Sequence, residues 1–178
     1  MANLLTAVRL VLAIPVALGF ANSGFLSGWV LLLLIIIACV TDFFDGKLAR
    51  ATNTTSAKGQ LFDHTTDFIF VTLALTGCAI FGLINPYLPA LILIAFSQYV
   101  IDSYYLHKQK ELKMSFLGRW NGILYFGPLI FLAVSRLGLG EDSKELMELI
   151  GSIFAWILSA STLLSIIDRG LAPLRKSD

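Results

Sequence analysis

Six stretches of about 20 apolar residues constrain the fold of this chain more than any other feature. An α-helix needs about 17 to 25 such residues to cross the hydrocarbon core of a bilayer. The sequence predicts helices of this kind over residues 4–22, 27–50, 57–83, 87–107, 117–137 and 147–168. The segments between them are short and polar, including GEDSKE at 140–145. We therefore expect residues 1–178 to form a single all-α domain, a polytopic membrane protein with six transmembrane helices.

The composition agrees with a membrane protein and excludes one class of partner. Hydrophobic residues make up 57% of the chain and charged residues only 14%, which is unusual for a soluble domain. The formal net charge is +1, so we expect no nucleic-acid partner, because such binding needs a clustered basic excess. Cys39 and Cys78 lie in apolar stretches and are interpreted as buried free thiols.

The distribution of basic residues predicts the orientation in the membrane. If six helices cross the bilayer, eleven of the 13 Lys and Arg residues fall on one side. They lie near the N-terminus, in the second-to-third and fourth-to-fifth connections, and at the C-terminus. Because Lys and Arg accumulate on the cytoplasmic side, both termini are predicted to be cytoplasmic, in what we interpret as a prokaryotic cytoplasmic membrane.

Four aspartates lie at the predicted cytoplasmic ends of the second and third helices. Asp42 and Asp45 are three residues apart and Asp63 and Asp67 are four apart, so each pair shares one helix face. A short connection makes the two helices antiparallel neighbours, and the two faces can converge. Clustered carboxylates repel one another in a low dielectric. Because their oxygens are ligands for Mg²⁺ or Mn²⁺, four of them suffice to hold two such ions about 4 Å apart.

The residues around the aspartates indicate a phosphate-containing ligand. Gly46 and Gly59 remove side chains where a ligand could approach the backbone, and Arg50 offers a planar fork for phosphate oxygens. Together with metal ions, these features predict a diphosphate site. His64 either adds a metal ligand or has a structural role. The alternative for the aspartates is that they cap helices and face water at the membrane edge.

The pattern of this stretch is D-x2-D-G-x2-A-R-x8-G-x3-D-x3-D, and it resembles the signature of the CDP-alcohol phosphotransferase family at every fixed position. These positions are Asp42, Asp45, Gly46, Ala49, Arg50, Gly59, Asp63 and Asp67. The segment NLLTAVR at 3–9 is similar to the opening of the first helix in the phosphatidylglycerophosphate synthase branch.

The resemblance implies an enzyme that transfers a phosphatidyl group from CDP-diacylglycerol to a small alcohol and releases CMP. The four aspartates would hold two divalent ions, Mg²⁺ or Mn²⁺, and Asp67 would also be the general base that deprotonates the attacking alcohol. A homodimer is implied as well. The residues implied to bind the CDP-linked donor are Gly46, Ala49, Arg50, Ser56, Gly59, Asn3 and Thr6. Capping of the first helix is the alternative role for Asn3 and Thr6.

The acceptor is predicted from basic residues beside this site. Lys113 and Arg119 are the best candidates to bind a phosphorylated acceptor, such as glycerol 3-phosphate or an inositol phosphate. The same residues could instead follow the positive-inside bias and contact anionic lipid. Two departures from the family concern the acceptor: Phe68 follows the fourth aspartate where many relatives carry a basic residue, and LGRWN at 117–121 matches a GKxxT-like pattern only loosely.

Two other functions remain compatible with acidic residues in a membrane protein. A two-metal lipid diphosphate hydrolase would need no alcohol. A cation transporter would place its carboxylates near the bilayer midplane, whereas these aspartates lie at helix ends. Asp102, within the predicted fourth helix, is either functional or paired with a neighbour. Trp29, Trp120 and Trp156 fit interfacial anchoring or helix packing.

Overall fold

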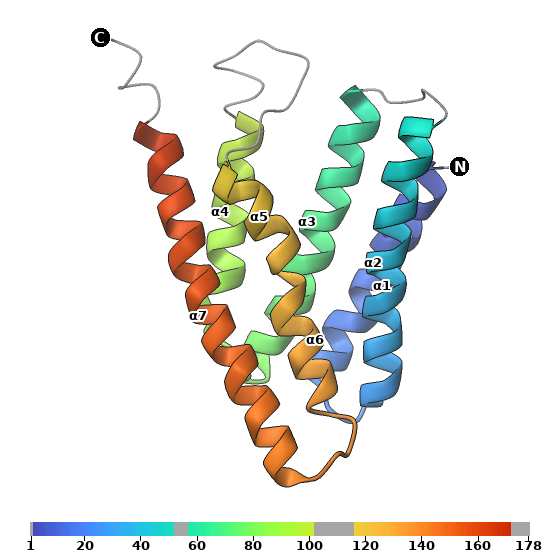
Figure 1. Cartoon of the computed structure of the whole chain (residues 1–178), viewed down its shortest axis with the longest axis vertical. Helices are drawn as coiled ribbons and strands as arrows, with labels where there is room; N and C mark the ends of the chain where they lie inside the picture. The colour runs from blue at the N-terminus through green and yellow to red at the C-terminus, as the bar shows by residue number, and fades with distance from the viewer. Residues whose placement is uncertain (1, 52–56, 102–115, 172–178) are drawn as a thin grey trace.

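The computed structural model consists of α-helices arranged as a bundle (Figure 1). It describes residues 2–51, 57–101 and 116–171, and no strand occurs within these ranges. The elements in order are α1 (Ala2–Ala21), α2 (Gly28–Ala51), α3 (Ala57–Ile80), α4 (Tyr87–Ile101), α5 (Phe116–Leu124), α6 (Phe126–Val134) and α7 (Glu141–Leu171). The first three follow the first three predicted helices closely, with α3 ending three residues early. Helix α4 begins at the predicted residue, and the predicted residues 102–107 of this helix lie outside the described part.

The predicted fifth helix is divided into α5 and α6 at Tyr125. Tyr125 keeps helical dihedral angles, with φ at −61° and ψ at −22°, so the two pieces are nearly continuous. Pro128, which is buried in α6, has no N–H to donate to the carbonyl of Leu124, and its ring crowds that carbonyl. Pro128 therefore explains why the α-helical hydrogen-bond pattern is interrupted at Tyr125.

The last helix begins six residues earlier than the sequence predicts, because most of the GEDSKE segment is helical. Glu141 and Asp142 lie in the first turn of α7, where negative charge interacts favourably with the helix dipole. Lys144 also pairs with Glu141 at 3.4 Å. The charged residues that the sequence suggests as a connection instead begin the helix.

The helices have the apolar surfaces expected of an integral membrane protein. Within the described ranges, Leu117–Val134 and Glu141–Leu171 are long and apolar enough to cross a membrane, as judged by length and composition. Shorter apolar stretches cover Thr6–Ala21, Gly28–Phe44 and Tyr87–Ile101. Trp29, Trp120 and Trp156 are about half exposed, as contact with lipid requires. The number of membrane crossings remains a prediction.

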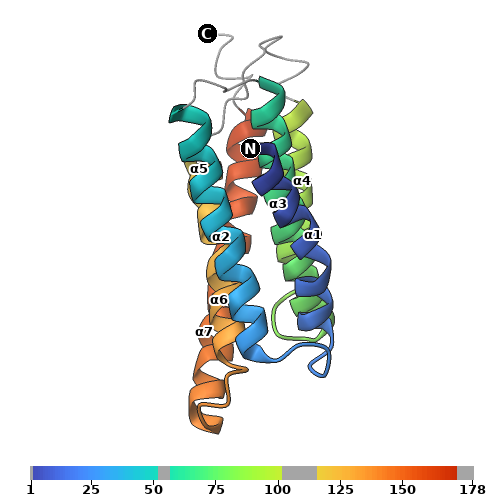
Figure 2. The same ribbon diagram turned by 90° about the vertical axis from the view of Figure 1, so that its right-hand side faces the viewer.

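The ends of the helices that carry the predicted site lie together. Figures 1 and 2 show the starts of α1, α3 and α5 and the ends of α2, α4 and α7 at the same end of the bundle. This arrangement gathers the helix ends that the sequence assigns to the cytoplasmic side. The cytoplasmic location of this end remains a prediction.

Helix α1 packs against both α2 and α3, and a glycine permits its closest approach. A Cβ atom at Gly77 of α3 would lie 2.2 Å from the carbonyl oxygen of Ala17, so no larger residue fits there. At the far end of α1, Arg136 donates hydrogen bonds to the carbonyls of Gly19 and Phe20 at 2.7 and 3.0 Å. These carbonyls belong to the last turn of the helix, where intrahelical donors are lacking.

Polar contacts attach α7 to the middle of the bundle. The hydroxyls of Tyr125 and Thr162 are 2.8 Å apart, and the Ser161 hydroxyl donates to the Asn121 side chain at 2.7 Å. The two cysteines, Cys39 and Cys78, are free thiols as predicted, although only the second is fully buried.

Candidate functional site

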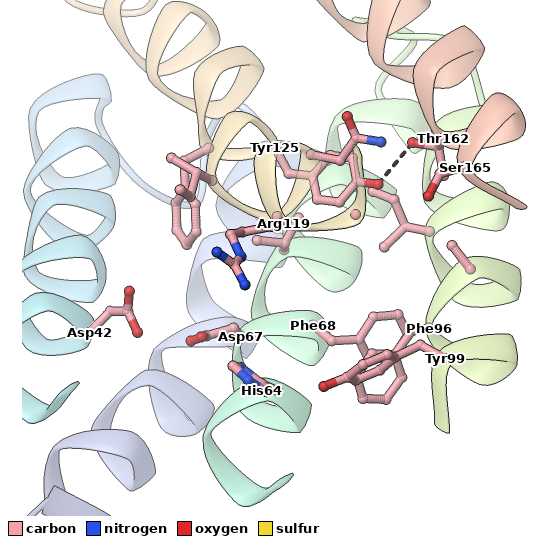
Figure 3. A pocket seen from close by; sticks show the side chains of 18 of the residues that line it. Asp42, His64, Asp67, Phe68, Phe96, Tyr99, Arg119, Tyr125, Thr162 and Ser165 are labelled. Atoms are coloured by element: carbon pink, nitrogen blue, oxygen red, sulfur yellow. Dashed lines mark hydrogen bonds between the residues drawn. The ribbon is translucent and has the colours of Figure 1, made fainter. Parts of the chain in front are cut away.

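Three of the four aspartates face one another across α2 and α3. Asp42 projects from α2, and Asp63 and Asp67 project from the second and third turns of α3. Figure 3 shows Asp42 on one side of a gap and Asp67 and His64 on the other. One potential ligand atom from each of Asp63, His64 and Asp67 lies within 4.8 Å of the others. The side chain of Asp45 lies outside the described part, so its contribution remains a prediction.

A buried arginine from α1 lies among these carboxylates. Nη1 of Arg9 donates to Oδ1 of Asp42 at 2.7 Å and also to Oδ1 of Asp67, while Nη2 donates to Oδ1 of Asp63 at 2.6 Å. The Arg9 side chain is 0% exposed, whereas that of Asp42 is 45% exposed and those of Asp63 and Asp67 are 28% exposed. One guanidinium thus compensates part of the negative charge of three carboxylates.

Arg9 is not among the site residues predicted from the sequence. There it contributed only to the count of basic residues near the N-terminus. The available signal was its position as the last residue of NLLTAVR, the segment that resembles the phosphatidylglycerophosphate synthase branch.

The predicted donor-binding residues are described only in part. Thr6 is buried one turn before Arg9 on α1, and Gly59 lies one turn before Asp63 on α3. Because α1 begins at Ala2, Thr6 lies in the second turn and does not cap the helix. Asn3 lies in α1, and Gly46, Ala49 and Arg50 lie in α2, but nothing beyond their backbone is described. Ser56 lies outside the described residues.

A cavity of about 730 Å³ opens beside the aspartates and is lined by residues of α2 to α7. Its acidic end is formed by Asp42, Asp63 and Asp67. Part of its wall is aromatic, because Phe68 stacks on Phe96 with ring centroids 4.0 Å apart and an interplanar angle of 8°. The phenylalanine that follows the fourth aspartate is therefore committed to packing against α4. Figure 3 shows this pair together with Tyr99 beside the aspartates.

The other side of the cavity carries a cation from α5. Arg119 is exposed and forms no ion pair with any described residue. Its side chain points into the cavity toward the aspartates in Figure 3. Two residues singled out from the sequence lie outside the described part: the second acceptor candidate, Lys113, and Asp102 of the predicted fourth helix. Arg119 is thus a described cation that is available to an anion entering the cavity.

Buried polar atoms also line the cavity between α4, α5 and α7. The Tyr99 hydroxyl has no hydrogen-bond partner within the described ranges, although this residue is only 5% exposed. The guanidinium carbon of Arg169 lies 5.2 Å from the centroid of the Tyr99 ring. Tyr99, Asn121 and Arg169 thus give this side of the cavity a partly polar lining.

The cavity at one end of this apolar helical bundle has an acidic cluster on one side and, on the other, an arginine that pairs with no described carboxylate. This arrangement suits a membrane enzyme that acts on phosphate groups. The chain belongs to the CDP-alcohol phosphatidyltransferase family, whose model matches residues 1–166. The family resemblance noted from the aspartate motif is therefore confirmed, together with the predicted class of transferase. Members of this family generally use divalent metal ions.

Several relatives are similar over most of the chain. A CDP-diacylglycerol–glycerol-3-phosphate 3-phosphatidyltransferase from Cereibacter sphaeroides is 31% identical over 148 residues, which cover 80% of this chain and 66% of that protein. One of the same name from Rickettsia felis is 26% identical over 169 residues, covering 92% and 89%. A CMP-forming cardiolipin synthase from Streptomyces coelicolor is 26% identical over 133 residues, covering 72% and 58%.

Proposed function

We propose that the protein transfers the phosphatidyl group of CDP-diacylglycerol to glycerol 3-phosphate, with release of CMP. The observation that carries this proposal is the arrangement of one cavity with the carboxylates of Asp42, Asp63 and Asp67 on one side and, on the other, the exposed cation of Arg119, which pairs with no described carboxylate. The first side suits a metal-bound diphosphate, and the second suits a phosphorylated alcohol. The names of the relatives favour glycerol 3-phosphate over an inositol phosphate as the acceptor.

The donor set at the acidic end fits divalent ions. Carboxylate oxygens are the preferred ligands of Mg²⁺ and common ligands of Mn²⁺, and the ligand atoms of Asp63, His64 and Asp67 are close enough to share an ion. We assign Asp42, Asp45, Asp63 and Asp67 as the residues that would hold two ions, with His64 as a possible addition or a structural neighbour. Bound ions would neutralise the diphosphate and stabilise the leaving CMP.

We assign the proton transfer to Asp67. Its carboxylate takes the proton of a glycerol 3-phosphate hydroxyl, while the hydroxyl oxygen forms a bond to the phosphorus of the phosphatidyl group. The bond from that phosphorus to the oxygen of CMP breaks, and CMP leaves with the bonding electrons. This direct displacement needs no covalent enzyme intermediate. Arg119 would hold the phosphate of the acceptor through charge-assisted hydrogen bonds.

Release of CMP by the purified protein tests this function. CDP-diacylglycerol in mixed micelles with Mg²⁺ is expected to yield CMP only when an acceptor is added, and glycerol 3-phosphate should be the best of a panel with inositol phosphate, glycerol and serine. Phosphatidylglycerophosphate should form in equal amount. CMP release at the same rate without any alcohol would instead identify a hydrolase, and failure to release CMP under all conditions would contradict the transferase.

Replacing Arg119 by glutamine is expected to raise the KM for glycerol 3-phosphate by about 10- to 100-fold and to leave the KM for CDP-diacylglycerol nearly unchanged. A hydrogen bond to a charged group contributes about 1.5 to 3 kcal/mol, and each 1.4 kcal/mol corresponds to about tenfold in affinity. Steady-state kinetics with each substrate varied in turn measures both constants. Lys144→Gln, a change of an exposed cation in the first turns of α7, is the matched control. An unchanged KM for glycerol 3-phosphate would leave Arg119 with a role toward anionic lipid.

A further inference from the structure

One guanidinium joins the two helices that carry the aspartates. Nη1 of Arg9 is shared between Asp42 of α2 and Asp67 of α3, and Nη2 binds Asp63 one turn away. In each of the three carboxylates the bonded oxygen is Oδ1. Arg9 therefore fixes one defined oxygen of each carboxylate and sets the directions in which the second oxygens point.

The three carboxylates border the cavity, but the arginine that binds them does not. Asp42, Asp63 and Asp67 line the cavity, whereas Arg9 is not among the described residues that do so, and its side chain is 0% exposed. A ligand in the cavity therefore meets the carboxylates, while the guanidinium contacts them from the protein side. The carboxylates keep 28% to 45% of their side-chain surface exposed, and this surface is open to a cation that enters from the cavity.

The packing of α1 against α3 sets the position of Arg9 along the bundle axis, beside the aspartates. Helices α1 and α3 start at the same end of the bundle (Figure 2), and they touch where Gly77 admits the carbonyl of Ala17. Arg9 precedes Ala17 by eight residues, and Asp67 precedes Gly77 by ten. At about 1.5 Å per residue, both side chains start roughly 12 to 15 Å from this contact. The close contact between α1 and α3 therefore places the guanidinium at the same position along the bundle axis as the carboxylates.

We propose that Arg9 is a positioning residue for the metal ions of the proposed function: it holds Oδ1 of Asp42, Asp63 and Asp67 and so presents these carboxylates to divalent cations in the cavity. The inference rests on that function because it concerns the same ions. Residues that orient metal ligands through hydrogen bonds typically change metal affinity by 10- to 100-fold when they are replaced. The planar guanidinium of arginine can bind several carboxylates in a fixed geometry. The single ammonium group of lysine cannot reproduce this geometry.

The test is the affinity of the purified protein for Mn²⁺ alone, measured by electron paramagnetic resonance of the free ion. Arg9→Gln is expected to raise the Kd about 10- to 100-fold. Arg9→Lys keeps the positive charge but loses the planar guanidinium. For this variant we expect the Kd for Mn²⁺ to rise at least about tenfold. The matched control is Arg136→Gln at the other end of α1, where the lost bonds are to backbone carbonyls. It should lower the Tm but leave the Kd for Mn²⁺ unchanged.

Each outcome decides between roles of Arg9. A Kd that is unchanged or lower in both Arg9 variants would overturn the proposal, since a guanidinium that merely occupies the site would weaken metal binding. A loss of affinity in Arg9→Gln that Arg9→Lys fully restores would reduce the role to charge compensation, and would also overturn it. Wild-type protein that binds no Mn²⁺ would remove the metal ions from the proposed function, and the inference with them.

A measurement on the wild-type protein covers the case in which Arg9→Gln does not fold. In an experimental structure with Mn²⁺ located by its anomalous scattering, Arg9 should keep its hydrogen bonds to Asp42 and Asp67 while the ion lies on the cavity side. A guanidinium that has left both carboxylates when Mn²⁺ is bound would contradict the proposal.

Discussion

Replacing Asp67 by asparagine is expected to lower the rate of CMP release by at least about 10³-fold. General acid–base catalysis contributes about 10²- to 10⁴-fold, and the amide of asparagine cannot accept the proton of an alcohol. Asp67 lines the cavity opposite Arg119, which is where the acceptor hydroxyl would lie. The residues proposed to contact the nucleotide of the donor do not include Asp67, so binding of CDP-diacylglycerol should persist.

Two further measurements separate proton transfer from ion binding at Asp67. The rate should stay low when Mn²⁺ is raised to excess, because added ions restore occupancy but not a base. Asp142→Asn, an equivalent change in the exposed first turn of α7, should keep the wild-type rate. Recovery of Asp67→Asn to within tenfold of the wild type by excess Mn²⁺ would leave Asp67 as a metal ligand alone and remove it as the base.

The positions of the helices were predictable because apolar length is a strong signal, whereas their exact ends depend on local residues. The start of α7 was missed because Glu141 and Asp142 were interpreted as a polar connection, although acidic residues also favour a first helical turn. The division at Tyr125 had a visible cause in Pro128. The helix boundaries were predicted from apolar length alone, so neither the acidic first turn of α7 nor Pro128 was used to place them.

Within the site, the local relations were predictable and the distant ones were not. The four-residue spacing of Asp63 and Asp67 places both on one face of α3, as the structure has them. Arg9, by contrast, is separated from Asp42, Asp63 and Asp67 by 33, 54 and 58 residues. Helical periodicity shows which residues share a face, but it does not show which helix packs against that face.

The packing of α1 against α3 depends on Gly77, whose role cannot be recognised from the sequence alone. Gly77 lies in an apolar stretch like several other glycines, and only the structure shows that its missing Cβ admits the backbone at Ala17.

Phe68 is a similar case. The sequence shows that it departs from the basic residue of many relatives, and the structure adds that it stacks on Phe96.

Removing divalent cations is expected to reduce CMP release by at least about 10³-fold, and excess Mg²⁺ or Mn²⁺ should restore it. Asp42, Asp63 and Asp67 together carry more negative charge than the single guanidinium of Arg9 compensates, and a diphosphate adds further negative charge beside them. Stabilising the charge of such a transition state by metal ions is worth several kcal/mol. Because 1.36 kcal/mol corresponds to tenfold in rate, about 4 kcal/mol gives a 10³-fold effect.

The chelated protein should remain folded, since Arg9 still joins Asp42 of α2 to Asp63 and Asp67 of α3 without any ion. CMP release is measured with excess EDTA and again after the ions are returned, while circular dichroism monitors helical content in the same samples. Full recovery of the rate with constant helicity would assign the loss to the chemistry rather than to unfolding. Undiminished CMP release in excess EDTA would overturn the metal assignment, and the aspartates would then have to act through Arg9 and the other cations of the cavity alone.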